Sequence, residues 1–440
     1  MRKGFIFNHN KCVNCNACSA ACILENGWTV HPRSIFTYNS KADHLLPLIN
    51  LSLACNHCES AVCMEGCPAS AFSREAVTGA IVLDEIKCIG CRYCQWNCPY
   101  NAPKFDSETG IIGKCNLCYM GLTEGRLPAC SMACPTGALS FGQLTGNEKV
   151  NVYTWFPVKK LNPAIEFTSV INNAPLKIIP DNIVAQTDSG ENKTKKNISG
   201  ELSLIMFSFM ATISVSIIVS SFLKGMYPDS SIFISVLLAT GITSLFHLGK
   251  KFRAWRSLAN LKNSPISREI AAFILYAVTS SLAIFLRMPA LLIASSITGL
   301  VFLLKIDSVY LFTVRNKSVI LHSGQTFISA LIIISFISGI LLPFVFMALI
   351  KLGLFVYRQI INKLNRSDSA FRFLRVAFLV VPGMSLILHN SIPENFIIIV
   401  FLTGELFDRI LFYIDFNPVN INSLIEEQLS IERDEKKRDK

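Results

Sequence analysis

No cysteine occurs after residue 134 of this 440-residue chain, although residues 1–134 contain all 16. The chain also has no long apolar run ahead of its first cysteine, because MRKGFIFNHNKC lacks the apolar core of a secretory signal peptide. We therefore expect no secretory leader. Disulfide frameworks belong to oxidising compartments and usually to small secreted domains, so these features argue against a disulfide-stabilised fold.

Charged residues are scarce and unbalanced. They make up 16% of the chain, and Lys and Arg exceed Asp and Glu enough to give a net charge of +11. Basic and aromatic residues do not alternate as they do in many nucleic-acid-binding surfaces, so no nucleic-acid partner is expected. The membrane half of the chain offers another reason for the positive excess.

The cysteines fall into four runs of four. The first and third runs follow C-x2-C-x2-C-x3-C, and the second and fourth lengthen the middle gap to four and eleven residues. Proline follows the last cysteine of three runs and suits a sharp turn there. The runs are Cys12, Cys15, Cys18 and Cys22; Cys55, Cys58, Cys63 and Cys67; Cys88, Cys91, Cys94 and Cys98; and Cys115, Cys118, Cys130 and Cys134.

This spacing is typical of bacterial ferredoxins that hold [4Fe–4S] clusters. The alternatives are disulfides and structural zinc, but zinc sites normally use two close cysteine pairs with a longer gap between them. Sixteen ligands predict four clusters. In two-cluster ferredoxins the fourth cysteine of each run binds the other cluster, so four runs predict two ferredoxin-like pairs. The spacing leaves open which runs are partners, and we expect the clusters to fill much of the interior.

The second half of the chain is dominated by apolar runs of about 20 residues, the length that crosses a bilayer. Residues 319–357 would make a helix of about 58 Å if unbroken, so we predict a break near Gly339 and Pro343. Only Arg287 separates the third and fourth spans, and Pro289 favours a turn there. Eight spans are predicted, with seven as the alternative: 202–223, 231–249, 270–286, 288–304, 320–341, 343–361, 371–389 and 395–414.

These patterns predict four segments and a fold class. An α+β ferredoxin-like iron–sulfur domain covers residues 1–175, and a polar linker covers 176–200. An all-α polytopic membrane domain covers 201–415. A charged tail covers residues 416–440, and its residues 425–440 are expected to be a solvated helix or disordered.

Lys and Arg in the short connections are unevenly distributed between the two sides of the predicted membrane domain. The side shared with the cysteine-rich domain has sixteen, and the other side has only Lys224 and Arg287. This asymmetry predicts a cytoplasmic cysteine-rich domain in a multi-pass protein of the inner (cell) membrane. The sixteen are Lys193, Lys195, Lys196, Lys250, Lys251, Arg253, Arg256, Lys262, Arg268, Arg315, Lys317, Arg358, Lys363, Arg366, Arg372 and Arg375.

The first half resembles the four-cluster electron-transfer subunit of dimethyl sulfoxide reductase-type molybdenum enzymes. Its motifs are CVNCNACSAACILENG, CNHCESAVCMEGCP, CIGCRYCQWNCPYNAPKF and KCNLCYMGLTEGRLPACSMACPTGAL. The second half is similar to the membrane anchor of the same enzymes through SLFHLGKKFRAWRSLANLKNSPISREI and GELFDRILFY. Two subunits that are usually encoded separately are thus expected to be one polypeptide.

The resemblance implies a nested pairing of the runs, with all ligands present where some relatives replace one and hold a three-iron cluster. The implied ligand sets are Cys12, Cys15, Cys18 and Cys134; Cys22, Cys115, Cys118 and Cys130; Cys55, Cys58, Cys63 and Cys98; and Cys67, Cys88, Cys91 and Cys94. It also implies that the anchor oxidises menaquinol from the menaquinone pool. Electrons would then pass through the four [4Fe–4S] clusters to a separate molybdopterin catalytic subunit.

Quinol oxidation releases protons, so its site needs a group that accepts them, such as a His or a carboxylate. His247 at the end of span two and Glu269 at the start of span three are the leading candidates, because both lie on the side of the cysteine-rich domain. His322 and the pair Glu405 and Arg409, which are four residues apart, lie on the same half. For each, a structural role is the alternative, such as a helix-stabilising pair.

Other ionisable residues within or near the spans are weaker candidates. His389 lies on the far side and is not expected to take part. Lys305, Asp307 and Lys351 are also near spans, and Lys351 is interpreted as a lysine that extends toward the membrane surface. The histidines do not form pairs with haem-ligating spacing, so no b-type haem is expected.

Three functions fit these features. The first is quinol oxidation for a molybdenum reductase. The second runs the same module in reverse and serves a formate dehydrogenase or a hydrogenase that reduces quinone. The third is a redox-driven ion transporter, but the nearly uncharged far halves of the spans argue against it.

Overall fold

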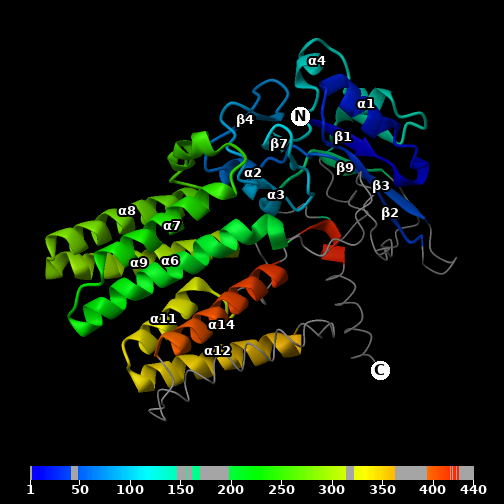
Figure 1. The fold of residues 1–440 in the computed structure, drawn as a ribbon. Coiled ribbons are helices and arrows are strands. Elements are labelled where there is room, and N and C mark those ends of the chain that lie inside the picture. The colour runs from blue at the N-terminus through cyan, green and yellow to red at the C-terminus, as the bar shows by residue number, and fades with distance from the viewer. Residues whose placement is uncertain are drawn as a thin grey trace, which may run out of the picture. The chain divides into compact units, whose positions relative to one another are not determined.

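The computed structural model divides into two compact units. The cysteine unit comprises Met1–Lys195, Phe252–Asn263 and Pro418–Lys440, and the helical unit comprises Lys196–Lys251 and Ser264–Asn417. Figure 1 shows the elements of both units. The structure describes residues 2–40, 48–145, 156, 161–168, 198–313, 322–361, 394–416, 418, 420–422 and 424–425.

In the described part of the cysteine unit, short strands form four small sheets. One sheet has the order β8-β1-β9, in which β1 pairs antiparallel with β8 and parallel with β9. The pairs β2–β3, β4–β5 and β6–β7 form antiparallel hairpins. The strands are β1 (Lys3–Phe7), β2 (Ser34–Tyr38), β3 (Ile49–Leu53), β4 (Phe72–Arg74), β5 (Ile81–Leu83), β6 (Lys104–Asp106), β7 (Ile111–Gly113), β8 (Leu139–Gln143) and β9 (Ile165–Phe167).

The helices of the cysteine unit are also short. They are η1 (His9–Lys11), α1 (Ala17–Asn26), α2 (Val62–Glu65), α3 (Tyr93–Asn97), α4 (Tyr119–Thr123) and α5 (Ala129–Met132), together with η3 (Lys251–Leu258), whose residues from Phe252 onward belong to this unit.

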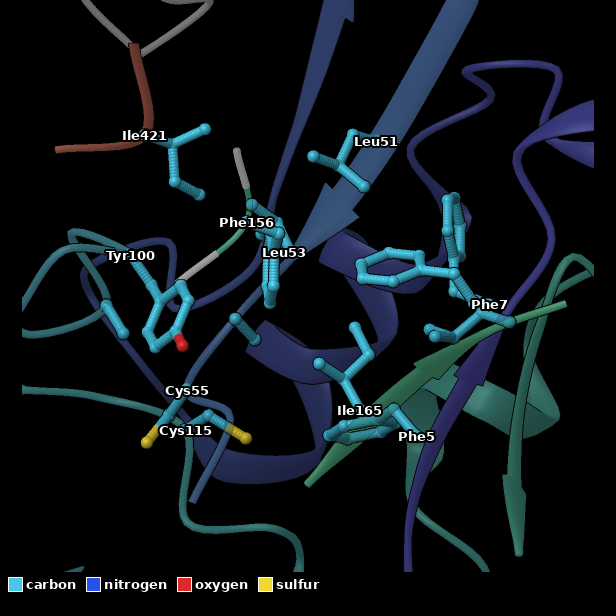
Figure 2. Close-up of a cluster of buried hydrophobic side chains, with 14 of the residues drawn as sticks. Phe5, Phe7, Leu51, Leu53, Cys55, Tyr100, Cys115, Phe156, Ile165 and Ile421 are labelled. Atoms are coloured by element: carbon cyan, nitrogen blue, oxygen red, sulfur yellow. The ribbon is translucent and has the colours of Figure 1, made fainter. Parts of the chain in front are cut away.

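A hydrophobic core lies beside the cysteines of this unit (Figure 2). Phe5 and Phe7 alternate on the buried side of β1, as expected of a strand that covers a core. Leu51 and Leu53 of β3 pack in the same cluster, whose members include Cys55. Aromatic and aliphatic side chains therefore contribute to the interior together with the ligand loops, more than the sequence suggested.

The segment after the last helix of the helical unit differs from its prediction. The sequence predicts that residues 425–440 are solvated or disordered, yet Ile425 is 1% exposed. Together with Ile421, which is 6% exposed, it belongs to the core cluster of the cysteine unit. Figure 2 shows Ile421 above Phe156 and Tyr100. Two apolar residues four positions apart lie on one face of a helical turn, and burying them stabilises the segment against that core. The described part of the tail is thus an element of the core.

The described part of the helical unit consists of apolar helices of 12 to 27 residues. They are α6 (Ile198–Lys224), α7 (Ser230–Phe246), α8 (Pro265–Leu286), α9 (Pro289–Thr313), α11 (Thr326–Ile337), α12 (Leu341–Ile361) and α14 (Glu394–Asp415).

Within the described part of the sequence, three helices are long and apolar enough to cross a membrane. They lie within α6, α8 and α9, and α7 with η3 adds a fourth if this pair, bent by 100°, counts as one span. The α11 and α12 segments are shorter apolar helices, and α14 includes three charged residues at positions 405, 408 and 409. The predicted number of eight spans is not confirmed, and the predicted span 371–389 falls outside the described residues.

Two predicted helix boundaries are confirmed. The break between α11 and α12 falls at Gly339, whose φ of 71° lies in the left-handed region that glycine adopts without strain. The turn between α8 and α9 uses Arg287, whose φ of 49° ends α8, and Pro289 then begins α9. Proline suits the first position of a helix because its missing N–H has no intrahelical partner there.

Small polar residues line the contact between α6 and α11. Ser216 and Ser220 donate hydrogen bonds to the carbonyls of Ala330 and Ile334, each at 3.4 Å. Small side chains let two helix backbones approach each other, and in an apolar environment their hydroxyls find partners in helix carbonyls. These hydrogen bonds join α6 to α11.

Candidate functional site

The third cysteine of each run occupies the same local position. Cys18, Cys63, Cys94 and Cys130 are each the second residue of a short helix, namely α1, α2, α3 and α5. The fourth cysteine of each run follows four residues later. The four runs therefore share one local geometry, although their middle gaps differ in length.

A second repeated feature is the backbone two residues after the first cysteine of each run. Asn14, His57, Gly90 and Leu117 all have positive φ, between 42° and 69°. A positive φ is unusual for a bulky residue such as Leu117 and persists only where the surroundings enforce it. The same turn recurs in all four runs, which indicates that each loop encloses a bound group of the same kind.

The structure brings together the cysteines that the resemblance assigns to common clusters. A cavity is lined by Cys12, Cys15, Cys18 and Cys134, which we call the first cysteine group. In the other three groups the thiols lie within electrostatic reach of one another. The second group is Cys22, Cys115, Cys118 and Cys130, the third is Cys55, Cys58, Cys63 and Cys98, and the fourth is Cys67, Cys88, Cys91 and Cys94.

Neighbouring groups are linked in a linear order. Cys18 of the first group lies within electrostatic reach of Cys130 of the second. Cys115 of the second group has the same relation to Cys55 of the third. Cys94 of the fourth group interacts in turn with Cys63 of the third. These electrostatic interactions link the groups in the order first, second, third and fourth.

Two buried cations lie at the junctions between groups. Arg33 is 1% exposed and interacts electrostatically with Cys18 of the first group and Cys130 of the second. Burial would lower the pKa of Arg33, but the nearby cysteines raise it above its usual value. Lys114 is 2% exposed, and its Nζ lies 3.7 Å from Cys55 Sγ and 2.8 Å from the carbonyl oxygen of Cys115. Arg33 and Lys114 therefore place buried positive charge where the negatively charged thiolates of neighbouring groups would lie close together.

The thiols themselves require a strong partner to ionise. Burial is the main cause that raises the pKa of Cys22, Cys58 and Cys91 to about 12, and neighbouring thiols raise it further. Among the described residues, no three His, Cys, Asp or Glu side chains are arranged to hold a single metal ion. Each cysteine group has four thiols, which matches the four thiolates that hold a [4Fe–4S] cluster.

A group of buried charges lies in the helical unit. Lys351 of α12 forms an ion pair with Glu405 of α14, contacts Asp408 at 3.2 Å, and donates to Ser329 Oγ at 3.0 Å. All three charged side chains are at most 5% exposed. Lys351 therefore does not extend to the membrane surface as predicted, because two carboxylates neutralise it inside the unit.

Arg409 lies next to this ion pair and has partners of three kinds. Its Nε donates to Ser208 Oγ at 2.8 Å and its Nη1 to the carbonyl of Gly324 at 2.9 Å. Its guanidinium also packs on the rings of Phe412 and Tyr413, 4.4 and 5.1 Å from their centroids. No ion pair joins it to Glu405 among the described contacts. Glu405 and Arg409, for which a helix-stabilising pair was the alternative role, therefore bind two separate sets of partners.

The predicted quinol-site residues are placed differently from one another. Glu269, in the second turn of α8, lies within electrostatic reach of Arg409 and Asp307. His247 is the C-cap of α7 and is half-buried. His322 is fully buried, with Nε2 3.4 Å from Asp415 Oδ2. The structure thus joins Glu269 to the buried charges, and His389 lies outside the described residues.

Comparisons with known proteins agree with both halves of this picture. A family model described as a 4Fe-4S dicluster domain matches residues 47–144, and one described as the DMSO reductase anchor subunit (DmsC) matches residues 199–400. The probable anaerobic dimethyl sulfoxide reductase chain YnfG of Escherichia coli is 36% identical over 151 residues, which are 32% of this chain and 73% of the relative.

Two further relatives match an equal share of the sequence. An anaerobic dimethyl sulfoxide reductase chain of Haemophilus influenzae is 36% identical over 152 residues, covering 32% of this protein and 74% of the relative. A sulfite dehydrogenase subunit of Allochromatium vinosum is 30% identical over 162 residues, covering 32% and 68%. The protein belongs to the family of these dimethyl sulfoxide reductase iron–sulfur chains. Its DmsC-type anchor is fused to the iron–sulfur domain in one polypeptide.

This membership establishes an iron–sulfur electron-transfer protein with the membrane anchor of a molybdopterin oxidoreductase family.

The sequence of this fused dimethyl sulfoxide reductase-type chain did not predict the full group of buried charges in the helical unit. Lys351, Asp408 and Asp307 lie near the candidates Glu405 and Arg409, and their place there was not predicted. A signal was present, since α14 carries three charges at positions 405, 408 and 409 within an apolar run. Such charges inside a membrane helix normally face partners in the bundle.

Proposed function

We propose that this chain oxidises menaquinol at its anchor and passes the electrons through four [4Fe–4S] clusters to a separate molybdopterin subunit. The observation that carries the proposal is the convergence of sixteen cysteines into four groups, which electrostatic interactions link in one linear order. An electron path needs redox centres within short distances of one another, and a linear order of neighbouring groups supplies that arrangement.

The four cysteine groups would each hold one cluster, and each bound cluster would accept and release one electron. Arg33, beside the first and second groups, would stabilise the extra negative charge of a reduced cluster. Lys114 would do the same for the second and third groups. The protein thus provides the ligands and fixed charge that set reduction potentials.

Quinol oxidation at the anchor would release two electrons and two protons. Glu269 and His247 are the proposed proton acceptors, and both flank the connection between α7 and α8. Asp307 and Arg409 lie within electrostatic reach of Glu269, so its charge would be coupled to a buried polar group rather than to bulk water.

The reverse direction is the second candidate. One relative is named as a subunit of a sulfite dehydrogenase, an activity that delivers electrons instead of consuming them. The same ligand groups and the same anchor would then pass electrons to quinone. Reduction potentials decide the direction, and they depend on charge and hydrogen bonding around each cluster.

We further propose that the chain is a multi-pass protein of the inner membrane whose cysteine unit faces the cytoplasm. The asymmetry of sixteen against two Lys and Arg in the short connections supports this orientation.

Replacing His247 with Leu, or Glu269 with Gln, tests the quinol site. Each variant should slow cluster reduction by a menaquinol analogue, while dithionite, which bypasses the anchor, should still reduce the clusters at the normal rate. The matched control is His389→Leu, which removes a histidine on the opposite predicted side. Full quinol-dependent reduction in both variants would place the site elsewhere, with His322 the next residue to test.

Iron analysis tests the cluster content. Protein purified without oxygen should contain roughly sixteen irons per chain, four for each of four clusters. Eight irons, or stoichiometric zinc, would contradict the proposed ligand groups.

A further inference from the structure

The segment Phe252–Asn263 connects two helices of the helical unit, yet it folds as part of the cysteine unit. It contains most of η3, and η3 is bent by 100° from α7. Ser257 is buried, and Arg253 and Asn260 are half-buried, whereas Phe252 and Trp255 are exposed. The segment therefore has one face in contact with protein and one face that is open.

Arg253 on the contacting face reaches the loop that carries Cys88. Its Nη1 donates to the carbonyl of Glu85 at 2.7 Å and to the carbonyl of Cys88 at 3.1 Å. A charged donor such as a guanidinium makes stronger hydrogen bonds to carbonyl oxygens than a neutral donor does. The guanidinium is thus held beside the first ligand of the third run.

Asn260 on the same face reaches the loop that carries Cys67. Its Nδ2 donates to the carbonyl of Glu65 at 2.9 Å and to the carbonyl of Cys67 at 3.0 Å. Cys67 and Cys88 come from different runs but are members of the same, fourth cysteine group. One short segment therefore connects both loops that would enclose a single cluster.

We propose that Phe252–Asn263 is a clip for the cluster of the fourth cysteine group, and that Arg253 sets the reduction potential of that cluster. The inference rests on the proposed function, because it requires the fourth group to hold a [4Fe–4S] cluster. A cluster bound by four thiolates gains one negative charge on reduction. A fixed guanidinium nearby stabilises the reduced form and raises the potential.

Arg253 and Asn260 have different roles. Asn260 is neutral, so it holds the Cys67 loop without contributing charge. Arg253 contributes both hydrogen bonds and charge. The anchor thus tunes the cluster at one end of the linear order through a segment that joins two of its own helices.

Redox titration of the full chain, followed by electron paramagnetic resonance, measures each cluster potential. Arg253→Gln should lower the midpoint potential of one cluster and leave the other three unchanged. Arg253→Lys keeps the charge and should retain most of the wild-type potential. Arg256→Gln is the matched control, since the Arg256 guanidinium packs on Trp255 at 4.9 Å, and it should shift no potential.

Asn260→Ala tests the clip separately from the charge. It should leave the potential of the fourth-group cluster near its wild-type value but speed iron release from that cluster to a chelator. Four unchanged potentials in Arg253→Gln, or an equal shift in Arg256→Gln, would overturn the role of Arg253. Unchanged iron release in Asn260→Ala would overturn the clip. A wild-type chain with fewer than four clusters would instead contradict the proposed function, so the two failures are distinct.

Discussion

Lys351, Glu405 and Asp408 form a buried charge cluster in which one cation faces two carboxylates. Taking charges out of water is costly, and the mutual attraction of the partners offsets that cost only while all of them are present. The hydrogen bond from Lys351 to Ser329 ties the cluster to the first turn of α11. Each of the three side chains therefore contributes to stability mainly by neutralising its buried partners.

Removing one partner should be more damaging than removing two. Lys351→Met leaves two carboxylates without their cation and should destabilise the protein by about 3–5 kcal/mol. Lys351→Met combined with Glu405→Gln should recover part of that loss. Thermal unfolding in detergent, or the yield of membrane-inserted protein, measures the difference. A double variant less stable than the single one would contradict this account.

Lys114 offers a parallel prediction in the cysteine unit. Lys114→Met removes a buried positive charge between the second and third cysteine groups, so the potentials of two clusters should fall together. Redox titration monitored by electron paramagnetic resonance measures both. Lys87→Met is the control, because Lys87 is half exposed and pairs with Asp84 at 3.0 Å. An equal shift of the two cluster potentials in Lys87→Met would show that the effect does not depend on the position of the lysine.

Single residues differ in how far the sequence reveals their surroundings. The cysteines that the resemblance groups lie together in the structure, because ligand spacing is imposed by the bound object and repeats in every run. The prediction for Lys351 is wrong, because its partners on α14 lie more than fifty positions away and no local pattern marks them. Pairing of buried charges is a tertiary property that hydropathy does not record.

At the scale of helices, Asp307 organises the start of α11 from a neighbouring helix. Its two carboxylate oxygens accept hydrogen bonds from the backbone N–H groups of Thr326 and Phe327, both at 3.0 Å. These are first-turn N–H groups, which have no partner within their own helix. The carboxylate also lies at the positive end of the helix dipole.

Asp307→Ala should therefore leave two buried donors unpaired and destabilise α11 by about 1–3 kcal/mol. Asp307→Asn retains one acceptor oxygen and should cost less. Thermal unfolding of both variants in detergent provides the comparison, with Lys305→Ala as a control on the same helix. Equal stability of the Ala variant and the wild type would show that other groups satisfy these N–H groups.

Helix ends were predictable where glycine and proline mark them, and less so elsewhere. Gly339 and Pro289 lie where the chain turns, because backbone constraints act locally. The predicted start of span five at residue 320 is wrong for α11, which begins at Thr326 after the turn that contains Gly324. Its N-terminal partner comes from α9, and local sequence does not show it.

For the whole molecule, the charge asymmetry predicts which side of the membrane each connection faces. Single cysteines introduced beside Lys224 and beside Lys363 should differ in labelling by an impermeant thiol reagent in intact cells. The Lys224 site should react and the Lys363 site should not, because the side rich in Lys and Arg remains in the cytoplasm. The opposite pattern would place the cysteine unit outside the cytoplasm.

The fusion of iron–sulfur domain and anchor raises the question of whether the covalent linker holds them together. The cysteine unit includes two segments from the second half of the chain, Phe252–Asn263 and the turn with Ile421 and Ile425. Each fully buried isoleucine contributes roughly 1.5–3 kcal/mol of apolar burial. Four further hydrogen bonds come from Arg253 and Asn260.

These contacts should keep the two halves associated after the linker is cut. A protease site placed at Gly190, within the predicted linker 176–200, allows cleavage of the purified protein in mild detergent. Affinity capture of the N-terminal half should retain the C-terminal half, since the buried segments lie beyond the cut. In Ile421→Asp with Ile425→Asp, a charge enters the core at each site, and capture of the cut chain should fall. Complete separation of the cut wild-type halves would show that the linker alone joins them.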